Sequence, residues 1–159
     1  MIATLPRQLA AALLLPALAA AASAPRWETY ANARFVYTLC YPADRLTPRP
    51  ESENGDGRAF TGARGGELKV WGQHNALERT LGQARAADEA RLADEGSAIT
   101  YRAAGRGWYV LSGRVGSTVF YLRSILSNDR FVTFELRYPA WQSGAWNPIA
   151  AHISRCLKG

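Results

Sequence analysis

The sequence has few of the residues that most often bind metals or perform catalysis. Its 159 residues include two histidines, two cysteines and one methionine, with no Cys-x-x-Cys pair and no Gly-x-Ser-x-Gly element. Structural zinc sites usually combine four cysteine or histidine ligands at short spacings, and α/β-hydrolases carry their nucleophile in the second pattern. We therefore expect no metal site and no cofactor, and no motif assigns a catalytic residue.

Lysine is also scarce, and the basic residues do not cluster. Lys69 and Lys158 are the only lysines, and the arginines are scattered singly along a chain whose net charge is +6. A nucleic-acid surface usually gathers basic residues on one element together with stacking aromatics. The scatter instead indicates a solvated, arginine-rich surface, so nucleic acid is not an expected partner.

Long hydrophobic runs are missing except at the N-terminus. Arg7 precedes a stretch rich in alanine and leucine that Pro16 interrupts, and an Ala-Ser-Ala sequence follows and ends at Ala24. This pattern predicts a secretory signal peptide over residues 1–24 rather than a membrane span, which needs about 20 apolar residues without a break. Cleavage would leave a single globular domain, residues 25–159, with no membrane span and a net charge of +5 once Arg7 is removed.

Both cysteines lie in the part expected to be exported. In an oxidising compartment Cys40 and Cys156 have only one intramolecular pairing. The bridge would close a loop of about 115 residues and stabilise the fold by about 4 to 5 kcal/mol in the chain-entropy model. Two buried free thiols are the alternative. We expect a structural disulfide in a protein of the periplasm or the extracellular space.

Alternating apolar residues and turn signals predict an α+β fold built on antiparallel strands. The segment 43–57 contains prolines, glycines and acidic residues and is predicted to be a polar loop. The predicted strands are residues 35–41, 58–61, 67–72, 98–102, 107–112, 117–126 and 130–138.

Two helices are predicted to flank this sheet. Asn75 fits the N-cap of a helix that continues to about Glu95, with an acidic residue at its third position. A second helix is predicted to begin at Asn147, which a proline follows. The apolar stripe of this helix places Cys156 inward, against a strand face that carries Cys40.

The element order and an aromatic entry pattern together resemble a known fold. The domain opens with Trp27-x-x-Tyr30-x-Asn32-x-Arg34-Phe35-x-Tyr37-x-x-x-Tyr41-Pro42, and Asn54-Gly55-Asp56-Gly57 and Ser112-Gly113 follow. This resembles the small secreted or lumenal domains of the PsbP-like fold and small bacterial periplasmic proteins. The resemblance implies an antiparallel sheet of six to seven strands flanked by two helices, an α/β/α sandwich, and an accessory or binding role without catalytic residues.

Two classes of function remain open. In the first, the chain is a non-enzymatic envelope protein that binds another envelope protein or a small ligand. Trp141 and Trp146 are its candidate contact residues, since loop aromatics bury large areas in interfaces, although packing against the last helix is the alternative role. In the second, the chain is a small hydrolase that uses His152 with Ser112 or Asp129. The oligomeric state is left open.

Overall fold

The computed structural model describes residues 24–159, so the predicted signal peptide lies outside the described residues except for Ala24. Seven antiparallel strands form the main sheet in the order β3-β4-β5-β9-β8-β7-β6, and β1 and β2 form a separate hairpin. The elements are β1 (Trp27–Asn32), β2 (Tyr37–Pro42), β3 (Thr47–Glu51), β4 (Gly57–Thr61), β5 (Glu67–His74), α1 (Leu81–Asp94), β6 (Ala98–Gly105), β7 (Trp108–Val115), β8 (Thr118–Ser127), β9 (Arg130–Pro139), the 3-10 turn η1 (Ala140–Gln142) and α2 (Ser143–Cys156).

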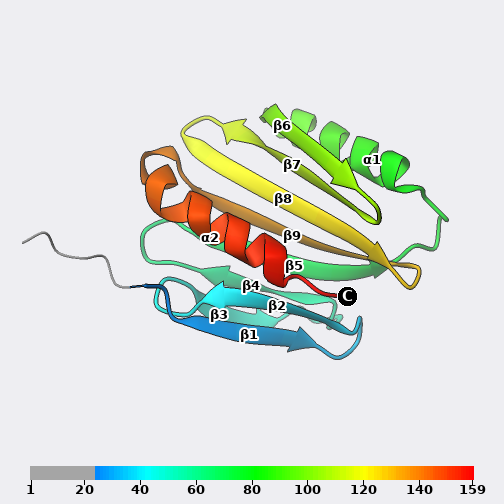
Figure 1. Cartoon of the computed structure of the whole chain (residues 1–159), viewed down its shortest axis with the longest axis horizontal. Helices are drawn as coiled ribbons and strands as arrows, with labels where there is room; N and C mark the ends of the chain where they lie inside the picture. The colour runs from blue at the N-terminus through cyan, green and yellow to red at the C-terminus, as the bar shows by residue number, and fades with distance from the viewer. Residues whose placement is uncertain (1–23) are drawn as a thin grey trace, which may run out of the picture.

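The layers of the domain are visible in Figure 1. Helix α2 and the β1–β2 hairpin lie side by side, and together they cover one face of the main sheet. Helix α1 covers the opposite face, where it contacts β6 and β7. The structure is therefore an α+β fold with a central antiparallel sheet between helical layers, as the sequence predicted.

The larger core lies between the main sheet and the layer formed by α2 and the hairpin. Tyr37, Leu39 and Tyr41 of β2 all enter it, because alternate side chains of a strand point to the same face. Ile149 and Ile153 of α2 enter the same core, since residues four apart lie on one side of a helix. The helix and the hairpin are thus held to the sheet by one continuous apolar cluster.

Ion pairs join α1 to the face of the sheet that it covers. Glu135 of β9 is buried, and it accepts a hydrogen bond from Arg91 of α1 at 2.9 Å. Arg137 contacts both Glu135 and Glu95, and Arg91 also donates to Glu95 at 2.7 Å. The hydrogen bond from Arg137, followed by that from Arg91, lowers the pKa of the Glu95 carboxyl against the opposing effect of burial.

The prediction of a loop over residues 43–57 was wrong in part, because the segment contains β3. This strand has all five residues exposed and two prolines, so it lacks the alternation that marks a half-buried strand. Strand β1 was also missed. It pairs with β2, so the first predicted strand, residues 35–41, belongs to the hairpin and not to the main sheet.

The predicted start of the first helix was also wrong. Asn75 caps only a turn, in which its Oδ1 accepts from the backbone N–H of Arg79 at 2.8 Å. Glu78, with a φ of 48°, cannot be part of a right-handed helix. Thr80 is the true N-cap, and it forms a reciprocal capping box with Gln83.

The second helix begins at Ser143, four residues before the predicted start at Asn147. No side chain caps its N-terminus, so the sequence carries no capping signal there. The turn η1 leads directly into the helix. Trp146, which was expected in a loop, consequently lies in the first turn of α2, and its side chain is buried.

Candidate functional site

A surface pocket of about 580 Å³ opens between the beginning of α2 and the loop that joins β4 to β5. We call it the tryptophan pocket, because both predicted contact residues line it. Its volume is in the range of small-molecule sites, roughly 300–1,000 Å³. Its lining includes the side chains of Asp44, Arg45, Arg64, Trp141, Gln142 and Trp146.

The two tryptophans have different roles in this pocket. Trp146 is 3% exposed, and its ring stacks on Tyr138 with centroids 5.8 Å apart. The ring also lies against Gly66, where an added Cβ would clash with it. Trp141, in contrast, is 80% exposed. Trp146 is therefore a packing residue that forms a wall of the pocket, and Trp141 is the residue available for contact.

Gln142 connects the parts of the pocket. Its Nε2 donates to the backbone carbonyl of Arg64 in the β4–β5 loop at 2.8 Å. Its Oε1 accepts from the indole N–H of Trp146 at 3.3 Å. Because both functional ends of this amide are occupied, the loop and the first turn of α2 are held together without a ligand. The pocket is thus largely formed in advance.

The charged side chains give the pocket a basic character. Arg45 lies 3.6 Å from the carboxylate of Asp44, which also accepts a hydrogen bond from the backbone N–H of Arg26 at 2.9 Å. Arg64 is exposed, and none of the ion pairs among residues 24–159 involves it. A guanidinium of this kind is suited to a carboxylate.

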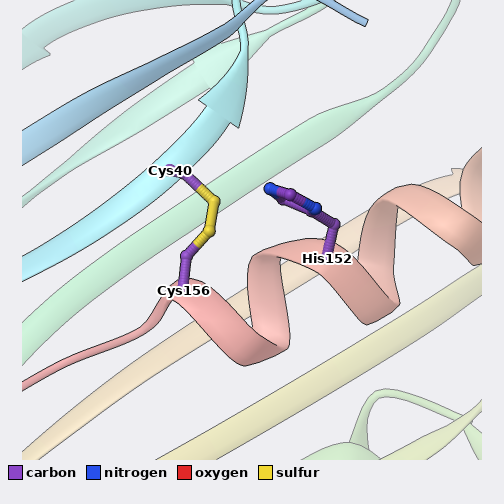
Figure 2. A group of neighbouring side chains, drawn as sticks. All are labelled: Cys40, His152 and Cys156. Atoms are coloured by element: carbon purple, nitrogen blue, oxygen red, sulfur yellow. A yellow bond between two sulfur atoms is a disulfide. The ribbon is translucent and has the colours of Figure 1, made fainter. Parts of the chain in front are cut away.

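The predicted disulfide is confirmed, since Cys40 and Cys156 are bonded with their Cα atoms 5.8 Å apart. Its predicted inward position was correct for Cys40, which is 7% exposed, and wrong for Cys156. Helix α2 lies beside β2 rather than across its face, and the bridge spans the two elements (Figure 2), so Cys156 remains half-buried. Both cysteines line a shallow depression together with His152, Arg155 and Lys158, which we call the cysteine hollow.

His152 is the third chemically active side chain of this hollow. Its ring stacks on Trp27 with centroids 3.9 Å apart, and a ring nitrogen lies within 4.8 Å of both sulfur atoms. Figure 2 shows the imidazole and the bridge side by side, with His152 and Cys156 on α2 and Cys40 on β2. The four-residue spacing of His152 and Cys156 predicts such a contact, but the expectation of no metal site did not take it into account.

The structure does not bring the candidate hydrolase residues together. Ser112 lies on β7, where its hydroxyl donates to the carbonyl of Phe120 at 2.7 Å. Asp129 is exposed in the turn between β8 and β9, and His152 lies in the cysteine hollow. Within residues 24–159, no hydrogen bond joins any two of Ser112, Asp129 and His152.

The comparisons with known proteins identify the fold. No protein-family model matches the sequence, and no curated protein matches it. Among solved structures, the domain is similar to the solution structure of cyanobacterial PsbP (CyanoP) from Synechocystis sp. PCC 6803. The TM-score is 0.64 at 15% sequence identity, over 91% of this chain and 98% of that chain. The chain therefore has the PsbP-like fold that the sequence pattern predicted.

Across residues 24–159, neither helix has the length and apolar character needed to cross a bilayer.

Proposed function

We propose that the protein is a non-enzymatic accessory module of the cell envelope, and that its tryptophan pocket holds an acidic segment of another envelope protein. The observation that carries this proposal is the exposure of the Trp141 side chain. Its indole is 80% exposed at the mouth of the 580 Å³ pocket, and tryptophan and arginine are enriched among the residues that dominate binding energies.

The chemistry of the rim supports an acidic partner. Arg64 supplies a guanidinium without an ion-pair partner among the described side chains, and Arg45 shares its charge with Asp44. An extended segment with one carboxylate against Arg64 and an apolar side chain against Trp141 would satisfy both features. Because Gln142 already braces the loop against the helix, little conformational entropy is lost on binding.

Two features support a location outside the cytoplasm. The N-terminal 24 residues have the pattern of a signal peptide, and the Cys40–Cys156 bridge is of the kind that persists in oxidising compartments. We infer that the mature domain, residues 25–159, acts in the periplasm or after secretion.

The separation of the candidate hydrolase residues favours binding over catalysis. The hydroxyl of Ser112 donates a hydrogen bond to a backbone carbonyl, and His152 lies in the cysteine hollow, which Ser112 does not line. We expect the purified mature domain to show no turnover with panels of ester, amide and glycoside substrates. A reproducible activity that disappears in His152→Ala or Ser112→Ala would contradict the proposal.

Binding can be tested by NMR with two matched synthetic peptides. One contains Asp and Glu around a leucine, and the other has Lys in place of the acidic residues. The indole N–H signal of Trp141 should shift with the acidic peptide only. Trp141→Ala should weaken binding at least about tenfold, roughly 1.4 kcal/mol. Tyr101→Ala, which removes another exposed aromatic, should leave binding unchanged.

Either of two results would count against the pocket. Equal shifts with both peptides would contradict the preference for acidic segments. Shifts that leave the signals of Trp141 and Arg64 in place would show that the peptide binds elsewhere.

A further inference from the structure

We propose that reduction of the Cys40–Cys156 bridge converts the cysteine hollow into a binding site for one thiophilic d¹⁰ cation, Zn²⁺ or Cu⁺, with both thiolates and the imidazole of His152 as ligands. Among the described residues, these three side chains form the one group of potential metal ligands that lies close together. Thiolate and imidazole are the donors that such cations prefer.

The positions of the ligand atoms fit a metal centre with little movement. One donor atom from each of the three side chains lies within 4.8 Å of the others. In a tetrahedral zinc site, Zn–S and Zn–N bonds of about 2.3 and 2.0 Å place neighbouring donors roughly 3.5–3.8 Å apart. Once the sulfur–sulfur bond is broken, the two sulfurs must move apart and the imidazole must approach by about an ångström, which side-chain rotation can supply. Three ligands leave one position for water.

The two elements that carry the ligands are joined by more than the disulfide. Thr38 of β2 and Lys158, just after α2, exchange two backbone hydrogen bonds, N–H to O at 2.9 and 3.0 Å. Ile153 and Leu157 are buried in the same core as Leu39 of β2. Because these contacts surround the bridge on both elements, we expect Cys40 and Cys156 to remain neighbours after reduction.

The surroundings favour thiolates and orient the imidazole. Stacking on Trp27 limits the directions in which the His152 ring can turn. Arg155 and Lys158 line the hollow beside the sulfurs, and positive neighbours stabilise thiolate anions. With Cu⁺ the two thiolates leave one net negative charge, which Arg155 and Lys158 would offset, and with Zn²⁺ they leave none. The hollow is open to solvent, which gives the cation access.

The conversion requires a two-electron reductant, and a dithiol supplies the electrons in two exchange steps. A thiolate of the reductant attacks the half-buried Cys156 sulfur, the sulfur–sulfur bond breaks, and Cys40 leaves as a thiolate that takes up a proton. The second thiol of the reductant then displaces Cys156 and closes the reductant's own disulfide. Two electrons and two protons pass to the protein. Binding of the cation afterwards releases both thiol protons to solvent.

The test compares the oxidised and reduced forms of the exported protein. After reduction with a phosphine and removal of the reductant without oxygen, Zn²⁺ and Cu⁺ are titrated against chromophoric chelators, and Co²⁺ serves as a spectroscopic probe of thiolate ligation. We expect one equivalent of cation in the reduced form and none in the oxidised form. The Co²⁺ adduct should show sulfur-to-metal charge-transfer absorption.

Two variants separate the proposed ligand from general effects. His152→Phe keeps an aromatic ring against Trp27 but removes the nitrogen donor, and it should lower the affinity of the reduced form at least about tenfold. His74→Phe changes the other histidine, outside the hollow, and should have no effect. Near-ultraviolet circular dichroism checks that each reduced protein remains folded.

Three results would overturn the proposal. The first is a reduced protein that binds no cation stoichiometrically. The second is equal affinity in His152→Phe and His74→Phe. The third is loss of the folded state on reduction, because the ligands would then not be held in place by β2 and α2.

Discussion

Removal of the disulfide is the perturbation whose energy follows most directly from the structure. Cys40 and Cys156 are separated by 116 residues in sequence. The chain-entropy model assigns about 4.8 kcal/mol to a loop of this length. The measured loss is expected to be smaller, because denatured chains retain residual structure that already limits their conformational freedom. The double variant Cys40→Ala/Cys156→Ala should therefore be less stable by about 2 to 5 kcal/mol.

Urea denaturation of the oxidised wild type and the double variant measures this difference. The bridge acts mainly on the unfolded chain, so the variant should also expose more surface on unfolding and show a larger dependence of the free energy of unfolding on urea. Its binding to the acidic peptide should be unchanged, since the bridge is not among the residues that line the tryptophan pocket. A loss below about 1 kcal/mol would refute the entropic reasoning. Two free thiols in the oxidised wild type, found by mass analysis after alkylation, would refute the bridge itself.

Two further predictions concern stability. Trp146→Ala should destabilise the domain by about 3 to 5 kcal/mol because it empties a buried site. Trp141→Ala should change the free energy of unfolding by less than about 0.5 kcal/mol. Similar losses in both variants, measured by urea denaturation, would contradict the different roles assigned to the two rings. The pKa of Glu95 is lowered in the folded state, first by the hydrogen bond from Arg137. The ionised carboxylate therefore stabilises the folded state above the ordinary carboxyl pKa, and this stabilisation is lost as the pH falls through the lowered pKa. Glu95→Gln should be less stable than wild type at neutral pH, by no more than about 1 kcal/mol, with a smaller difference in acid; a difference independent of pH would contradict this assignment.

Alternating burial made some main-sheet strands predictable, β5 and β8 among them. In β8, for example, Phe120, Leu122 and Ser124 are buried while the residues between them are partly exposed, and this difference produces a period of two in the sequence. Strand β3 has no such difference, because all of its residues are exposed. It is held by backbone pairing to β4, and backbone pairing leaves little trace in residue type.

The candidate site was predictable only in part. In the sequence, Trp141 and Trp146 flank the segment Gln142-Ser143-Gly144-Ala145, and nothing there distinguishes the two rings. Trp146 is buried because its ring packs against Gly66 and Tyr138. These residues belong to other parts of the fold, Gly66 to the β4–β5 loop and Tyr138 to β9. The contribution of Arg64 likewise comes from a loop brought to α2 by tertiary packing.

The position of the disulfide depended on how α2 lies relative to the hairpin in their common layer. An inward-facing Cys156 follows if α2 crosses the face of β2. Instead, the helix lies beside the hairpin, and Ile153 fills the core, so Cys156 lies at the margin of the apolar stripe. The predicted apolar stripe of α2 was correct, but the sequence did not specify which element would lie against the margin of that stripe.

Photo-crosslinking at position 141 in living cells tests the central proposal most directly. A photoreactive amino acid replaces Trp141 in one strain and Tyr101 in a control strain, since both side chains are exposed. We predict that position 141 forms an adduct with an envelope protein, that the attached peptide is acidic, and that Arg64→Glu abolishes the adduct. Adducts of equal yield at both positions, or attachment of a basic segment at position 141, would contradict the proposed function.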